Sequence, residues 1–84
     1  MVKEGDYVAV FHSVHRVLKA EKILKESEIA FTLIPAPRQL SADCGLALCF
    51  AQGEHAGIVE VLGRAGVAIA ELWVMQAGKY TQIV

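Results

Sequence analysis

The chain has 84 residues, the size of one small domain, so we expect residues 1–84 to form a single domain. Its 8 Lys and Arg residues against 9 Asp and Glu residues give a formal net charge of -1. This balance provides no basic surface for nucleic acid or for an anionic membrane, so neither is expected as a partner.

The hydrophobic fraction of 55% does not indicate a membrane span. The longest stretch without Asp, Glu, Lys or Arg runs from Cys44 to Gly53, which is too short to cross a bilayer. The first residues lack the apolar region of a secretory signal, so we expect a cytoplasmic protein. The excess of apolar residues must then be buried in a core or between subunits.

The first half of the chain predicts a strand, a helix and a second strand. Residues 7–12 form an apolar run with β-branched and aromatic side chains, which favours a strand buried on both faces. Ser13 is a candidate N-cap for an amphipathic helix over residues 14–26. The second strand, residues 30–34, should end at Pro35, which has no N–H for ladder pairing.

The second half begins with the one long loop that we expect, residues 35–43. An apolar run predicts a strand at 46–51, and alternation of apolar and charged residues predicts a helix at 55–65. A fourth strand is expected at 68–75. Residues 80–84 could add a short edge segment or a docking tail.

This order of elements, β-α-β-β-α-β, predicts an α+β fold of the ferredoxin-like type. In that sandwich, right-handed crossovers place two helices on one face of a four-stranded antiparallel sheet. The first and third strands are the central pair, which agrees with their uniformly apolar sequences.

Strand alternation divides the expected sheet into two faces. We assign to the helix-covered face Val8, Val10, Leu46, Leu48, Phe50, Ala70, Leu72 and Val74. The opposite face then carries Tyr7, Ala9, Phe11, Ala47, Cys49, Ala51, Ile69, Glu71 and Trp73. A helix-free face so rich in apolar side chains is typical of an interface, so we expect a homo-oligomer formed through it. The alternative is that residues 78–84 fold over this face.

Cys44 is the best candidate for a chemical centre. It lies at a junction of loop and strand beside Gly45, which permits close approach or unusual backbone angles. Arg38 could stabilise the thiolate or hold an anionic substrate group, while Pro35 and Pro37 would stiffen the loop. The alternative interpretation is a small packed thiol beside the loop.

The second cysteine, Cys49, should point to the other sheet face from Cys44 and pack at the interface. Five positions of extended chain separate the two residues by about 16 Å, whereas a disulfide needs Cα atoms within about 7 Å. An internal disulfide is therefore not expected. Two thiols alone do not complete a zinc site, and no cofactor is expected.

The three histidines begin or end predicted elements: His12 ends the first strand, His15 begins the first helix and His55 begins the second. We expect all three at one edge of the fold, where the positive field of two helix N-termini opposes a metal cation. An anion held by His12 and Ser13 is physically easier, and surface or capping histidines are the alternative. Cys44 is expected at the opposite edge from His12, so the sequence predicts no Cys–His pair and does not favour an enzyme.

Four segments together resemble a family of small bacterial domains of unknown function described as selenium/sulfur carrier-like proteins. They are Phe11-His12-Ser13, Ala20-Glu21-Lys22 with Leu24-Lys25, Ile34-Pro35-Ala36-Pro37-Arg38 and Cys44-Gly45-Leu46-Ala47-Leu48. The likeness runs from about residue 8 to residue 50.

The resemblance implies a cysteine that carries sulfur or selenium as a persulfide or selenosulfide, and this residue maps to Cys44. Arg38 maps to the loop arginine. Sulfur or selenium donor and acceptor proteins would then be partners. The alternative function is a non-enzymatic, oligomeric binding or regulatory module in which Cys44 is structural or redox-sensing.

Overall fold

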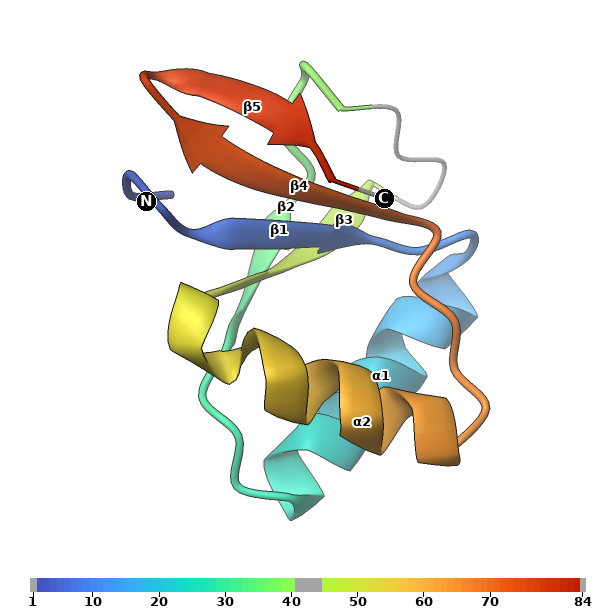
Figure 1. Ribbon diagram of the computed structural model, residues 1–84. Helices are drawn as coiled ribbons and strands as arrows, with labels where there is room; N and C mark the ends of the chain where they lie inside the picture. Colours follow the sequence, from blue (N-terminus) through green and yellow to red (C-terminus); the bar gives the residue numbers. More distant parts are fainter. Residues whose placement is uncertain (1, 41–44, 84) are drawn as a thin grey trace.

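The computed structural model describes residues 2–40 and 45–83. Within these residues the chain forms five strands, two α-helices and one short 3-10 helix, arranged as one sheet with both α-helices on the same side (Figure 1). In chain order the elements are β1 (Tyr7–Val10), α1 (Val14–Glu26), β2 (Thr32–Pro35), β3 (Leu46–Phe50), η1 (Gln52–Glu54), α2 (His55–Arg64), β4 (Glu71–Gln76) and β5 (Lys79–Gln82). Neither α-helix in this part of the chain is long and apolar enough to cross a membrane.

The sheet is antiparallel throughout, with strand order β2-β3-β1-β4-β5. The first four strands and the two α-helices follow the expected β-α-β-β-α-β order, so the α+β class is confirmed. The expected four strands are a correction, because β5 pairs with β4 and adds a fifth at the edge.

The β4–β5 turn explains why the fifth strand was not predicted as a full strand. Ala77 and Gly78 have φ angles of 52° and 74°, the left-handed pair that a tight type I′ hairpin requires. The carboxylate of Glu4 accepts hydrogen bonds from both backbone N–H groups, at 2.7 and 3.4 Å. Ala-Gly is a weaker hairpin signal than Asn-Gly, so the turn depends on a residue more than 70 positions away.

The helices follow their local sequence closely. Helix α1 has the predicted bounds, and the Oγ atom of Ser13 accepts a hydrogen bond from the N–H of Arg16 at 3.3 Å, which confirms the N-cap. Its buried residues are Val17, Ala20 and Leu24. Helix α2 buries Ile58 and Leu62 against the same core.

The face assignment was right for β3 and β4 and wrong for β1. Ala9 and Phe11 pack with the helices, whereas Val8 and Val10 lie on the helix-free face, where Val8 pairs with Cys49. All residues of β1 are apolar, so no alternation fixed which set faced the helices, and a shift of one residue inverts the whole strand.

The helix-free face is covered, not exposed as expected. Val8 and Ala47 have no exposed surface, because Leu40 of the β2–β3 loop packs on them and is itself only 5% exposed. The C-terminal residues form β5 at the edge of the sheet, with Tyr80 at the margin of this cluster. Among the described residues, the large apolar side chains with most exposure are Val14, Leu18, Val59 and Ile83.

Candidate functional site

The β2–β3 loop starts and ends at paired backbone positions. Pro35 is opposite Leu46 in the last strand pair, and the N–H of Ala36 donates to the carbonyl oxygen of Gly45 at 2.9 Å. The base of the loop is therefore closed by the sheet itself. Ser41 to Cys44, which include the predicted reactive thiol, lie outside the described residues.

Gly45 has a left-handed backbone conformation, with φ at +72°. Glycine adopts this region without the steric cost that a Cβ atom imposes. No atom lies within 4 Å of the position that a Cβ would take, so the constraint at Gly45 is conformational and not one of space. The way the chain enters β3 thus favours a glycine directly after Cys44.

The Pro-x-Pro-Arg segment forms a turn that exposes its arginine. The N–H of Leu40 donates to the carbonyl oxygen of Pro37 at 3.0 Å, and Arg38 and Gln39 lie between them, both exposed. Burial of Leu40 fixes the turn against the sheet. Within residues 2–40 and 45–83 no carboxylate forms an ion pair with Arg38, and the residue is exposed to solvent.

The structure corrects the expected separation of His12 from the start of β3. Because β1 and β3 are antiparallel, Val10 near the end of β1 pairs with Ala47 near the start of β3. His12 follows β1 by two residues, so His12, Ser13 and Gly45 all belong to the same end of the sheet. An anion site at His12 and Ser13 stays a prediction. The Ser13 hydroxyl already caps α1.

The expectation that all three histidines share one edge is wrong. The ring of His55 lies 4.9 Å from that of Tyr7, the first residue of β1, and stacks on Phe50 at 6.4 Å. His55 is therefore at the opposite end of β1 from His12 and His15. In the described part of the chain, no three His, Cys, Asp or Glu residues gather closely enough to hold a metal ion.

Cys49 lies on the helix-free face, as predicted, but packs within its own subunit. It is 6% exposed, and its Sγ atom lies 3.6 Å from Oδ2 of Asp6, to which it donates a hydrogen bond. Burial raises the pKa of the Cys49 thiol, and the Asp6 carboxylate raises it further, from 9.0 to about 11. Cys49 is thus protonated at neutral pH and a poor nucleophile.

The sequence analysis did not identify two residues that shape these sites: Leu40, which anchors the loop, and Asp6, which contacts Cys49. Leu40 stood in a segment assigned to loop, and Asp6 stood before the first strand. Asp6 has the same parity as Val8, so once β1 is placed correctly its side chain falls on the face of Cys49. Leu40 is one apolar residue in a polar stretch, a weaker signal that the structure alone resolves.

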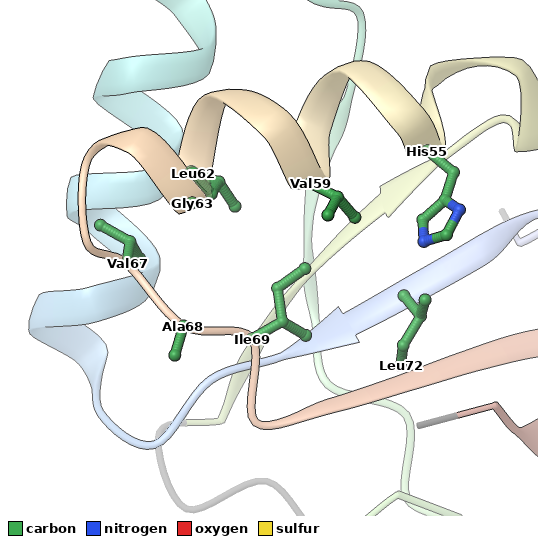
Figure 2. A pocket seen from close by; sticks show the side chains of 8 residues that line it. All are labelled: His55, Val59, Leu62, Gly63, Val67, Ala68, Ile69 and Leu72. Carbon is green, nitrogen blue, oxygen red and sulfur yellow. The ribbon is translucent and has the colours of Figure 1, made fainter.

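A cleft of about 300 Å³ opens between α2 and β4 on the helix-covered side of the sheet. Figure 2 shows Val59 and His55 of α2 on one wall, with Leu72 of β4 and Ile69 of the preceding connection opposite them. Its lining is mostly apolar, and the His55 imidazole supplies a polar group at one end. Such a cleft could receive an apolar side chain, and the residues that line it include no cysteine, serine or threonine.

A comparison with family models gives a match for this chain. Residues 6–74 match the family model described as "Putative Se/S carrier protein-like". The chain belongs to this family. Searches of curated proteins and of solved structures gave no match. The matched residues include the whole Pro-x-Pro-Arg loop, the Cys44-Gly45 pair, strands β1 to β3 and the first four residues of β4.

Proposed function

We propose that this Se/S carrier-like protein carries a sulfur or selenium atom on the Cys44 thiol. The observation that carries the proposal is the family match over residues 6–74, within which only two cysteines occur, Cys44 and Cys49. Cys49 is unsuited to the role because it is buried and held protonated. Cys44 follows a loop anchored at Leu40 that exposes Arg38.

The transfer is a thiol exchange that needs no resident cofactor. The Cys44 thiolate attacks the outer sulfur of a hydropersulfide R–S–SH on a donor. The donor S–S bond breaks, a new S–S bond forms on Cys44, and the electron pair leaves on the donor thiolate R–S⁻. The proton stays on the transferred sulfur, so the product is Cys44–S–SH. A selenium atom in the outer position transfers with the same balance and yields a selenosulfide.

Arg38 has a supporting role in this scheme. It is exposed and belongs to the loop that leads into β3, so its guanidinium could favour the thiolate of Cys44 or hold an anionic group of the donor. Pro35 and Pro37 limit the backbone freedom of the loop, and Gly45 allows the chain to turn into β3. Donor and acceptor proteins are the partners that a carrier of this kind requires.

The direct test is intact-mass spectrometry after treatment with glutathione persulfide. We expect one added sulfur in the wild type and in Cys49→Ser, and none in Cys44→Ser. Cyanide, which removes sulfane sulfur, should reverse the addition. Addition to Cys44→Ser at the wild-type level would contradict the proposal.

The second candidate is a binding or regulatory module without a carrier function. The apolar cleft between α2 and β4, with the exposed Val59 at its wall, favours this alternative. Thiol reactivity discriminates between the two: a module needs no accessible Cys44 thiol. If Cys44 reacts with iodoacetamide only after denaturation, the carrier proposal fails and the module takes its place.

Homo-oligomerisation through the helix-free face remains a prediction. Its expected basis was an exposed apolar face, whereas Val8 and Val10 are covered by the chain itself. What remains for a partner is the half-buried margin with Trp73 and Tyr80. Sedimentation equilibrium over a range of concentrations tests it: a dimer weakened by Tyr80→Glu would support this face, and a monomer at every concentration would exclude it.

A further inference from the structure

The second cysteine has a fixed carboxylate as its neighbour. Sγ of Cys49 donates a hydrogen bond to Oδ2 of Asp6 at 3.6 Å, across 43 positions of sequence. Both residues lie near the end of β3 that is remote from Gly45, roughly 13 Å along the strand at 3.3 Å per residue.

The Asp6 carboxylate is held in place by the backbone around it. Its Oδ2 atom also accepts a hydrogen bond from the N–H of Lys3 at 3.0 Å. The N–H of Asp6 donates to the carbonyl oxygen of Lys3 at 2.9 Å, and the N–H of Met75 donates to the carbonyl oxygen of Asp6 at 3.0 Å. One of these contacts orients the carboxylate and the other two fix the backbone that bears it, so its charge is a constant part of the environment of Cys49.

Burial alone does not isolate this thiol. A cavity of about 280 Å³ is lined by Cys49 and Asp6 together with Lys3 and Thr32, and both polar and apolar groups face it. A small reagent or a persulfide can therefore come close to Sγ. What then limits reaction is the protonation state, because the thiolate and not the thiol is the nucleophile.

We propose that Asp6 is a specificity-determining residue that keeps Cys49 in the thiol form, so that sulfur or selenium is loaded on Cys44 alone. This inference rests on the proposed carrier function. A sulfur atom placed on Cys49 would be buried against the sheet, where an acceptor protein could not collect it. The carboxylate prevents that loss by accepting the S–H hydrogen and opposing a second negative charge beside it.

The other charged groups near Cys49 do not cancel this effect. Burial and then the Asp6 carboxylate raise the pKa of Cys49 to about 11. Lys3, across the cavity, is exposed to solvent, which screens its charge. Tyr80 faces the same thiol, and its own pKa is raised by burial and then by Cys49, so its phenol stays uncharged. The positive charge of the N-terminus lowers the pKa of Cys49, but it is the smallest of the causes and the pKa stays raised.

The test replaces Asp6 by Asn, which keeps an oxygen for the N–H of Lys3 but removes the negative charge. The pH dependence of iodoacetamide labelling is measured at each cysteine by peptide mass spectrometry. In the wild type, Cys49 should label with a midpoint near pH 11. In Asp6→Asn the midpoint should fall toward the value that burial alone sets, so that labelling of Cys49 at pH 8 becomes faster than in the wild type. Glutathione persulfide should then add a second sulfur, on Cys49.

Glu4→Gln is the matched control. Glu4 is also an N-terminal carboxylate that accepts backbone hydrogen bonds, from Ala77 and Gly78, and it has no contact with Cys49. It should leave the Cys49 midpoint unchanged. An equal gain of Cys49 reactivity in Glu4→Gln would mean that the N-terminal segment has merely loosened, and it would overturn the proposal.

The inference also fails if Asp6→Asn leaves the midpoint unchanged, or if wild-type Cys49 labels with an ordinary thiol midpoint or not at all. Should Asp6→Asn not fold, Asp6→Ser, which also removes the charge, takes its place, because the wild-type midpoint alone does not separate Asp6 from burial. Alkylation at Cys49 does not depend on loading of Cys44. Absence of sulfur on Cys44 in every variant would therefore refute the carrier function and leave the measurement at Cys49 intact.

Discussion

The two ends of β3 differ in the charged groups near them. At the start of the strand, Gly45 turns the chain out of a loop that exposes Arg38 to solvent. Near its other end, Cys49 is buried beside a carboxylate that holds its proton. The difference teaches that one strand can have an exposed cation in the loop that leads into its start and a fixed anion beside its far end, so the thiol proposed as carrier and Cys49 would meet opposite charges.

Leu40 anchors the described part of the β2–β3 loop, and removing its side chain should have the largest effect. Leu40→Ala deletes a side chain that is 5% exposed and packs on Val8 and Ala47. We expect a loss of about 2–4 kcal/mol in the free energy of unfolding, measured by urea denaturation. Leu18→Ala is the control, since Leu18 is 44% exposed and should lose less than about 1 kcal/mol. Equal losses would show that the loop is not held by Leu40.

The backbone at Gly45 can be tested separately from packing. Gly45→Ala places a Cβ in open space but in a left-handed conformation, so the expected cost is about 1–2 kcal/mol, from backbone strain alone. Gly63→Ala is the matched control: it also meets open space, but it lies within α2 and should stabilise by about 0.5–1 kcal/mol. The same sign for both variants would contradict the assigned backbone geometry.

The effect of the cation at the loop end can be tested by removing Arg38. Arg38→Ala should slow alkylation of Cys44 near pH 7 a few-fold at low salt, because an exposed guanidinium stabilises a thiolate only weakly. Arg38→Lys should retain part of the effect. Arg64→Ala, on the last turn of α2, should leave Cys44 unchanged. If the alkylation rate of Cys44 is the same in Arg38→Ala as in the wild type, Arg38 has no part in the site.

At the other end, the raised pKa of Cys49 predicts a small pH dependence of stability. Below about pH 9 the thiol is protonated in both the folded and the unfolded chain, and its contribution is fully present. Between about pH 9 and 11 the unfolded chain loses the proton while the folded chain keeps it, so the free energy of unfolding falls as pH rises. Cys49→Ser, which does not titrate, should show a shallower fall in urea midpoints over this range. If the urea midpoints of the wild type and of Cys49→Ser fall equally with pH, the pKa of Cys49 is not raised in the folded protein.

Local signals in the sequence determined part of this structure. The Ser13 cap and the apolar spacing after it specify both ends of α1, because capping and helical periodicity act within a few residues. The faces of β3 were also predictable, since Leu48 and Phe50 are large whereas Ala47 and Cys49 are small. The identity of Cys44 as the candidate thiol likewise came from the sequence, through its neighbours Arg38 and Gly45.

Tertiary structure decided the rest, for reasons that no local pattern contains. An apolar strand such as β1 is compatible with either orientation, so only its pairing with β3 and β4 set which side faces the helices. Antiparallel pairing also places the end of β1 next to the start of β3. His12 therefore lies at the end of the sheet where β3 starts, and His55 lies at the opposite end, against Tyr7. The Asp6–Cys49 contact and the packing of Leu40 join residues far apart in the chain, and such contacts exist only once the sheet has formed.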